Sequence, residues 1–338
     1  MQGYHSYSAE NGYSSRYLPE GYRNPIGNGF RSALSDIEHA FCEDRIIEVP
    51  ISLCDNNFCL YADLGSGIVG RIAREECLYL QSSEPMKDIA VLTRVGKTVA
   101  CKVLAIEHHP EETVVHLSRR AAQIECAEQY LSTLSPGDLI PAKVTHLEPF
   151  GAFCDVGCGI VALLSIDAIS ISRISHPSDR LSPGQKIHVV VKAIDREHHR
   201  IFLSLKELLG TWEENASLFT PGQTVTGVVR SIESYGIFVE LMPNLAGLAE
   251  RPGMDTNIPL PNIGETVAVY IKSILPERMK VKLVLIDPCH SDLQSDKKKK
   301  SIRYFIDPSK ARHIDRFRYS PAAAMRIVET IFEDPSPL

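Results

Sequence analysis

The sequence lacks long apolar runs and lacks the common fingerprints of catalysis. No segment approaches the roughly 20 consecutive apolar residues that a membrane span requires. The opening stretch, MQGYHSYSAENGYSSRYLPEG, has no apolar core of the kind found in a secretory signal. Gly-x-Ser-x-Gly, Walker-type and dinucleotide-binding motifs are missing as well. We therefore expect a cytoplasmic protein that has no membrane partner, no catalytic residues and no cofactor.

The nine cysteines include no Cys-x-x-Cys pair. An odd number of scattered cysteines argues against both a disulfide framework and a zinc site. Cys154 and Cys158 are four residues apart, but no second pair or nearby histidine completes a ligand set. The pairs His108-His109 and His198-His199 fall in predicted hairpin turns without converging partners. We expect no metal site.

The chain has little excess of charge, and its sign is unfavourable for contact with phosphates. The net charge over 338 residues is −6, whereas neutralising phosphates requires Lys and Arg. The charges are segregated, however, because residues 296–320 hold nine basic and three acidic residues. A basic C-terminal region therefore follows a more acidic body, and the length predicts two or three domains.

An internal repeat decides the architecture. SPGDLIPAKVTHLEPFGAFCDVGCGIVALL begins at Ser135, and TPGQTVTGVVRSIESYGIFVELMPNLAGLA begins at Thr220. The Pro-Gly pairs of the two copies are 85 residues apart, and so are Phe150 and Tyr235, so the copies stay in register without a gap. A fainter third copy, VPISLCDNNFCLYADLGSGIVGRI, begins at Val49. Such self-similarity predicts three units of one fold.

Each unit has the alternating, β-branched pattern of five short strands. In the middle copy these strands are expected at 139–147, 152–156, 161–164, 186–194 and 201–205. Five short strands in about 70 residues match the strand count of an OB-fold barrel, and closure protects edges that would otherwise be exposed. The predicted fold is mainly β, with three tandem five-stranded OB-fold barrels joined by short helices and followed by a small C-terminal α/β element.

The domain boundaries follow from the repeats and from the segments between them. Helical spacing after Ala121 and after Lys206 predicts the two linkers, and Trp212, the only tryptophan, is expected to pack in one of them. The sequence SIRYFIDP suggests a strand, and PAAAMRIVETIFED reads as an amphipathic helix that starts at Pro321. We predict a Tyr/Gly/Ser-rich tail, disordered over 1–30, at 1–44; a degenerate barrel at 45–120; barrels at 136–208 and 220–287; and a basic extension with a helix at 288–338.

The aromatic-Gly-x-Phe element carries most of the functional signal. Residues three apart in a regular strand point to opposite faces, and a glycine after the first ring permits a bulge or turn that brings both rings to one side. Phe150 with Phe153, and Tyr235 with Phe238, would then form exposed platforms for base stacking. The alternative is that the rings fill the barrels. Basic residues on the same strands and hairpins would track the RNA backbone; they are Lys143, Arg196, Arg200, Arg230, Lys280 and Lys282.

The segment PGDLIPAKVTHLEPFGAFCDVG, with LSPGQKIHVVVKAIDREHHRIFLSLK after it, resembles the S1 domain, the repeated OB-type RNA-binding module of bacterial ribosomal protein S1. The resemblance is strong over residues 136–207, good over 221–286 and weak over 45–119. It implies an RNA surface made of the two aromatics, a His after the third strand, and an Asp and an Arg near the last hairpin. These positions map to Phe150 and Phe153, to Ser165 in place of the His, and to Asp195 and Arg200.

Departures from the family pattern predict unequal roles for the three units. Glu250 occupies the His position in the third copy and would repel phosphate. The first copy has Cys59 for the glycine and Ala73 for the His, so Phe58 and Tyr61 form at most a weaker site and this unit is expected to dock another surface.

The sequence is consistent with two functions. The first is non-catalytic binding of single-stranded RNA, such as mRNA, in translation or RNA metabolism, with the small ribosomal subunit as a possible partner. The second is a ribosome- or protein-docking scaffold whose barrels bind protein more than RNA. A nuclease is disfavoured, because three barrels leave too little chain for a catalytic domain.

Overall fold

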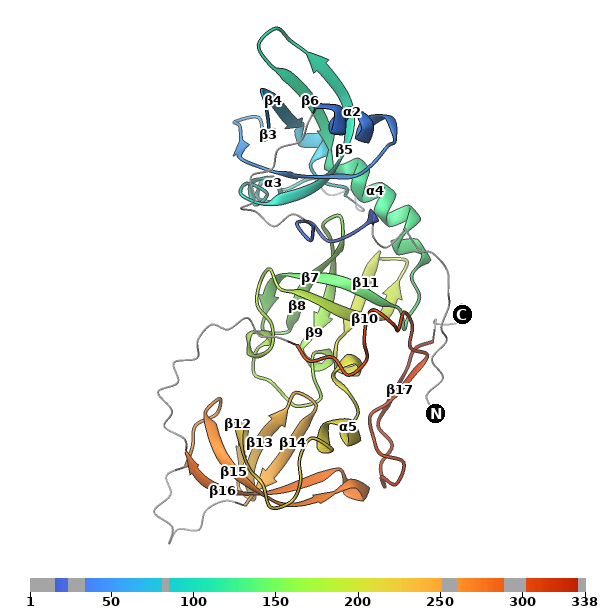
Figure 1. The fold of residues 1–338 in the computed structure, drawn as a ribbon. Coiled ribbons are helices and arrows are strands. Elements are labelled where there is room, and N and C mark those ends of the chain that lie inside the picture. The colour runs from blue at the N-terminus through green and yellow to red at the C-terminus, as the bar shows by residue number, and fades with distance from the viewer. Residues whose placement is uncertain (1–15, 24–33, 81–84, 251–259, 289–301, 334–338) are drawn as a thin grey trace.

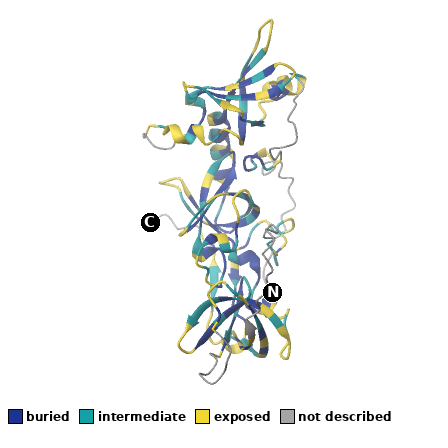
Figure 2. Cartoon of the chain, turned by 90° about the vertical axis from the view of Figure 1, so that its left-hand side faces the viewer, coloured by how far each residue is buried: buried dark blue, intermediate teal, exposed yellow. Residues whose placement is uncertain are grey.

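Three β units follow one another along the chain and stack end to end (Figure 1). The computed structural model describes residues 16–23, 34–80, 85–250, 260–288 and 302–333. Buried residues gather inside the units and along the junctions between them (Figure 2). One continuous core runs through the second and third units and the C-terminal segment, whereas the first unit has a core of its own. Within these described ranges, no helix is both long and apolar enough to cross a membrane.

The middle unit is a closed five-stranded barrel with the order β10-β11-β9-β8-β7. Its strands are β7 (Leu139–Glu148), β8 (Gly151–Gly157), β9 (Ile160–Ser165), β10 (Lys186–Asp195) and β11 (Arg200–Ser204). Strand β7 pairs with both β8 and β10 and so closes the barrel. Its alternate residues Ile140, Ala142 and Val144 point into the core. The five predicted strands are confirmed to within one residue at each end.

The third unit repeats this barrel with the order β12-β13-β14-β16-β15. Its strands are β12 (Thr224–Glu233), β13 (Gly236–Met242), β14 (Leu245–Ala249), β15 (Thr266–Leu275) and β16 (Lys280–Pro288). The first strand has its bulge at the same place in both barrels, after Val144 in one and after Val229 in the other. The sequence repeat is therefore a structural repeat down to its irregularities.

The first unit departs from the five-stranded plan because its first strand is split. The pieces are β1 (Ile47–Pro50) and β2 (Leu53–Cys54), at opposite ends of the sheet β1-β5-β6-β4-β3-β2. Between them, the Ile51 amide donates to the Lys97 carbonyl and the Ser52 amide to that of Tyr61, so the broken strand still reaches both neighbours. The remaining elements are α2 (Leu34–Cys42), β3 (Leu60–Gly65), β4 (Ile68–Ile72), η1 (Arg74–Glu76), α3 (Asp88–Leu92), β5 (Thr98–His108) and β6 (Thr113–Ser118).

Short helices join the units, as predicted. Helix α4 (Arg119–Gln129) and the turn η2 (Leu131–Thr133) link the first two, and η5 (Lys206–Leu209) with α5 (Trp212–Ala216) links the last two. Ser118 caps α4 by accepting from the Ala121 amide, and Thr211 with Glu214 forms a capping box at α5. Trp212 is buried in the shared core, which confirms its packing role. The loops hold the further turns η3 (Ile166–Ala168), η4 (Pro177–Asp179) and η6 (Pro276–Arg278).

The prediction of a disordered N-terminal tail is wrong for residues 16–23; residues 1–15 and 24–33 lie outside the described ranges. Tyr17 is 1% exposed, stacks on Tyr130 and donates its hydroxyl to Glu125 at 2.8 Å. Glu20 pairs with Arg119 at 2.6 Å. The composition of the tail did not reveal this order because the side chains of the segment are buried against the units on either side.

The predicted C-terminal helix is also wrong. Residues 302–308 form no strand, and the segment instead contains a small sheet of β17 (Arg316–Arg318) and β18 (Glu329–Ile331). Apolar spacing over so short a stretch cannot stabilise a helix without a surface to cover. Met325 and Ile327 are 80% and 60% exposed, so that surface is lacking. Residues 302–314 instead pack against the closed middle barrel, where the Leu139 amide donates to the Arg312 carbonyl.

Candidate nucleic-acid interface

The aromatic pair of the middle barrel stands on its outer surface. Phe150 lies in the turn between β7 and β8 and is 55% exposed, and Phe153 on β8 is half-buried. Their ring centroids are 5.9 Å apart and their planes are nearly perpendicular, at 86°. The two rings thus form a corner with one exposed wall rather than a flat platform. The alternative that they fill the barrel is excluded.

The glycine between the rings serves a different purpose from the one predicted. Gly151 does not adopt a positive φ, so it supplies no strained turn. A Cβ at this position would lie 2.5 Å from the Leu164 carbonyl oxygen and 3.0 Å from the Ser165 Cα. The glycine therefore lets strand β9 approach closely, and Phe150 points outward because it lies in the turn.

Cross-strand pairing extends the ring pair into an apolar row that the sequence analysis missed. Phe153 lies opposite Leu163 on β9, and Leu163 lies opposite Phe202 on β11. All three are partly exposed on the outer face. Phe202 was missed because it belongs to the surface only through the register of three strands. The signal available in the sequence was an apolar residue in RIFLSL at a position that strand alternation places on the outer face.

The positions mapped by resemblance lie at both ends of this row. Ser165 lies opposite Gly151, beside the exposed ring. Asp195 and Arg200 face each other across the β10–β11 hairpin. Asp195 accepts from the His198 backbone amide at 3.0 Å and contacts the His198 ring nitrogen at 2.9 Å. The backbone bond contributes most to lowering the pKa of this carboxyl. Arg200 is exposed at the rim.

Two predicted basic residues of the middle barrel are engaged by protein groups. Lys143 donates to the Glu20 carbonyl at 2.7 Å. The Arg196 guanidinium lies 3.3 Å from the Ser132 carbonyl oxygen and 3.5 Å from that of Leu134. Both cations therefore hold neighbouring segments of the protein, and neither contacts the ring pair.

The third barrel reproduces the ring pair but replaces part of the row with a cation. Tyr235 is 65% exposed, and its ring centroid lies 6.2 Å from that of Phe238 at a right angle. Phe238 lies opposite Leu248, which lies opposite Lys282. Lys282 therefore occupies the register position that Phe202 has in the middle barrel.

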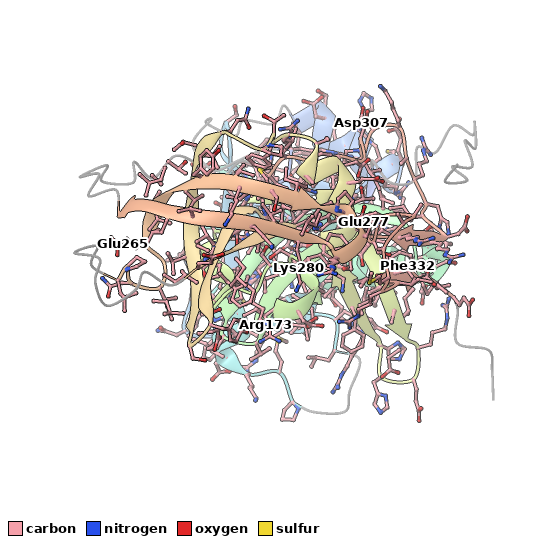
Figure 3. All side chains as sticks on the ribbon, turned by 90° about the horizontal axis from the view of Figure 1, so that it is seen from below. Arg173, Glu265, Glu277, Lys280, Asp307 and Phe332 are labelled. Atoms are coloured by element: carbon pink, nitrogen blue, oxygen red, sulfur yellow. The ribbon has the colours of Figure 1, made fainter. Side chains whose placement is uncertain are left out.

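Lys280 stands at the register position of Arg200. It pairs with Leu275 across the last hairpin, as Arg200 pairs with Asp195. Figure 3 shows Lys280 and Glu277 at this turn. Both lysines of β16 are exposed, so the third barrel presents more free positive charge beside its rings than the middle barrel does.

The other charged residues of the third barrel are less available. Arg230 is only 12% exposed and pairs with Glu240 at 2.7 Å and with Asp179 at 3.2 Å. The exposed Glu250 lies 3.9 Å from Lys272. Arg230 thus holds the junction between the barrels, while Glu250 places a negative charge one residue beyond the end of β14.

The first unit does not present a free pair of rings. Phe58 is capped by Arg74, whose guanidinium carbon lies 4.7 Å from the ring centroid. The Tyr61 hydroxyl donates to Asp55 at 3.1 Å. Its row across the sheet runs from Tyr61 to Arg71 and then to His116. A polar row thus replaces the apolar one.

Comparison with known proteins agrees with this geometry. Residues 133–206 match the family described as the S1 RNA binding domain. The small ribosomal subunit protein bS1 of Staphylococcus aureus strain COL is 33% identical over 221 residues, which cover 58% of this chain and 55% of that protein. The bS1 homolog of Bacillus subtilis is 37% identical over 158 residues, covering 45% and 41%. The chain therefore spans about half the length of the curated relatives it matches.

Among solved structures, a multidomain protein with nucleic acid binding domains from Streptococcus pneumoniae covers 72% of this chain and 73% of its own. It is 16% identical with a TM-score of 0.23. The family match over residues 133–206 and the sequence relatives, together with two closed barrels and a third related unit, show a chain of tandem β units that resembles bacterial ribosomal protein S1.

Proposed function

We propose that this protein binds single-stranded RNA without catalysis, through the outer faces of its second and third barrels, in translation or RNA metabolism in the cytoplasm. The observation that carries the proposal is the exposed ring pair found in both barrels. Phe150 and Tyr235 are the most exposed aromatic side chains of the described chain. Each base stacked on such a ring contributes on the order of 1–3 kcal/mol and can be of any type.

The two barrels would combine stacking and charge in different proportions. In the middle barrel the corner of Phe150 and Phe153 continues into Leu163 and Phe202, so bases would find an apolar track there. In the third barrel Lys280 and Lys282 stand beside the rings and would contact phosphates. Ser165, Asp195 and Arg200 would add polar contacts at the ends of the middle row. Lys143, Arg196 and Arg230 are assigned structural contacts in this proposal because protein groups already engage them.

The test is a titration of a labelled single-stranded RNA of about ten nucleotides at two salt concentrations. Binding is expected to weaken with salt through counterion release. The double variant Phe150→Ala/Tyr235→Ala should bind at least tenfold more weakly, while Phe41→Ala, which removes an exposed ring from the first unit, should bind like the wild type. RNA affinity that stays unchanged in the double variant would refute the proposal.

The docking-scaffold alternative fits only the first unit, whose rings are capped by Arg74 and tied to Asp55. The relatives are named as proteins of the small ribosomal subunit, and we propose that subunit and its mRNA as partners here. Co-sedimentation with ribosomal subunits before and after RNase treatment separates the two functions. RNase-sensitive association supports the RNA proposal, and RNase-resistant association supports docking through protein.

A further inference from the structure

The two closed barrels differ at the edge where their first strand begins. In the middle barrel, the Leu139 amide donates to the Arg312 carbonyl at 2.9 Å, and the Ile314 amide donates to the Gly137 carbonyl at 2.9 Å. Between these two bonds, residues 138 and 313 form an antiparallel bridge. Residues 312–314 therefore lie along the start of strand β7 as a short added strand.

The same backbone groups of the third barrel have no such partner. The Gly222 amide and the Gln223 carbonyl are bonded to Ile271 of β15, as the matching groups of the middle barrel are bonded to β10. The Thr224 amide faces away from β15, because neighbouring residues of a strand alternate in direction. Gly222 has the same left-handed backbone as Gly137, with φ +94° against +98°, so its carbonyl is placed alike. Neither the Thr224 amide nor the Gly222 carbonyl has a hydrogen bond to any described residue.

The surroundings of the two glycines confirm that one edge is covered and the other is open. A Cβ on Gly137 would lie 2.4 Å from the Ile314 carbonyl oxygen, whereas a Cβ on Gly222 would have no atom within 4 Å. Pro136 and Gly137 are buried, and Pro221 and Gly222, at the same place in the repeat, are exposed.

The neighbouring strand shows the same difference. Val190 on β10 lies opposite Leu139 and is fully buried. Tyr270 on β15 lies opposite Thr224 and is 39% exposed. A free strand edge is a template for pairing with a further chain segment. The third barrel thus keeps such an edge at the start of β12, although its five strands close.

One side chain at each edge indicates what the added strand must carry. Asp138 accepts from the Ser135 amide through Oδ2, and its Oδ1 lies 2.7 Å from the His313 ring nitrogen. Gln223 accepts from the Thr220 amide through Oε1 at 2.9 Å. Its amide nitrogen, a donor, therefore takes the place of the Asp138 oxygen that faces the histidine. The matching residue of a segment on β12 should offer an acceptor oxygen instead of a histidine.

We propose that this edge binds an extended acidic segment of a partner protein as an added antiparallel strand. The backbone of the segment accepts from the Thr224 amide and donates to the Gly222 carbonyl, and an Asp or Glu between these bonds accepts from the Gln223 side chain. Strand addition of this kind takes its affinity from backbone bonds and its specificity from side chains. The site does not depend on the proposed RNA surface, because Tyr235 follows the opposite end of β12.

The chain supplies its own template for the probes. One labelled peptide is KARHIDR, the sequence of residues 310–316, and the other is KARDIDR, which differs by Asp at the central position. Each is titrated with the full chain and followed by fluorescence anisotropy. The wild type should bind KARDIDR about tenfold more tightly than KARHIDR. Gln223→Asp gives β12 the acid that β7 has at Asp138 and should reverse this preference.

A second pair of variants tests whether the backbone is used. Thr224→Pro removes the amide donor and should weaken binding of KARDIDR at least tenfold. Thr224→Val keeps the amide, removes only the hydroxyl and should bind like the wild type. Proline is tolerated at the first residue of a strand, and thermal unfolding of both variants checks that the barrel is retained. The Gln223 comparison does not require the proline variant.

Several outcomes would overturn the inference. The first is a lack of saturable binding of both peptides at millimolar concentrations of the chain, and the second is unchanged binding of KARDIDR by folded Thr224→Pro. Displacement of KARDIDR by a ten-nucleotide RNA would assign the edge to RNA. A wild-type dimer that Thr224→Pro dissociates would assign it to a second copy. Peptide binding that persists in Phe150→Ala/Tyr235→Ala separates this site from the RNA surface, so either proposal can fail alone.

Discussion

The two junctions between the barrels are built from the same kinds of charge but pair them differently. At the junction of the first and second units, Glu20 of the N-terminal segment meets Arg94, Arg119 and Asp155. At the junction of the second and third barrels, Asp179 and Arg180 meet Arg230 and Glu240. Each of these two clusters contains two acids and two arginines.

The acids at the centres of the junctions occupy the same place in their barrels. Asp155 and Glu240 both stand just before a bulge, opposite Val161 and Ala246. Glu240 touches two guanidinium groups directly. Asp155 accepts only backbone amides, from Glu20, Gly157 and Gly159. Burial, followed by the charge of Glu20, raises the pKa of Asp155 to about 7, although the backbone hydrogen bonds from Glu20 and Gly157 oppose this rise. The two carboxylates thus differ in their hydrogen-bond partners, although both junctions contain acids and arginines.

The largest expected effect comes from breaking the second junction. Glu240→Gln removes the carboxylate shared by Arg180 and Arg230 and leaves buried cations short of a partner. Removing one side of a buried ion pair costs about 3–5 kcal/mol, and this loss should appear as a lower midpoint of urea unfolding. The matched control is Asp63→Asn, the same strand position in the first unit, where the side chain is exposed. Equal losses in the two variants would show that the junction adds no stability.

The barrels on either side of that junction are expected to differ in how they grip RNA. Phe202→Ala should weaken binding about 5- to 150-fold, from the loss of ~1–3 kcal/mol of stacking, by the same factor at low and high salt. Lys282→Ala, at the matching register position, should weaken binding a few-fold at low salt and reduce the salt dependence by about one counterion. Titrations at several salt concentrations measure both slopes. Identical slopes would contradict the assignment of stacking to one barrel and charge to the other.

A smaller effect is expected from titrating the first junction. The pKa of Asp155 is raised in the folded chain from about 3.8 to about 7. Its contribution to stability is therefore complete below pH 4 and is lost as the pH rises through 7. The free energy of unfolding of the wild type should fall from pH 5 to pH 8 relative to that of Asp155→Asn, which cannot titrate. Urea unfolding at the two pH values checks this, and parallel behaviour of the two proteins would mean that Asp155 ionises normally.

The smallest effect concerns the unfavourable charge near the rings of the third barrel. Glu250→Ser gives this position the residue type found at Ser165 of the middle barrel. An exposed charge contributes roughly 0.2–1 kcal/mol, so RNA should bind about 1.4- to fivefold more tightly at low salt. Glu38→Ser, on helix α2 of the first unit, is the control for a change in total charge. A gain of the same size in both variants would trace the effect to net charge.

The repeat and the strand pattern were sufficient to predict the barrels and the exposed rings. Alternation in segments such as KIHVVVKAID and the fixed offset between Phe150 and Tyr235 are local signals, and local signals are what a sequence displays directly. The linker helices and the packing of Trp212 followed for the same reason.

Long-range contacts could not be predicted in this way. Phe202 joins the row only through pairing across three strands, and Lys143 and Arg230 look like free surface cations until Glu20 and Glu240 are placed against them. The residues at 16–23 and 321–331 were misjudged because their conformation depends on the surface that each segment meets or lacks.

The middle barrel receives backbone partners from both ends of the chain: the Cys158 amide donates to the Leu18 carbonyl, and the Ile314 amide donates to that of Gly137. During synthesis, the last of these partners leaves the ribosome more than 100 residues after strand β11. This barrel closes with its own five strands, but the backbone contacts that both ends of the chain add to it form late, and a fragment of residues 136–208 would lack them.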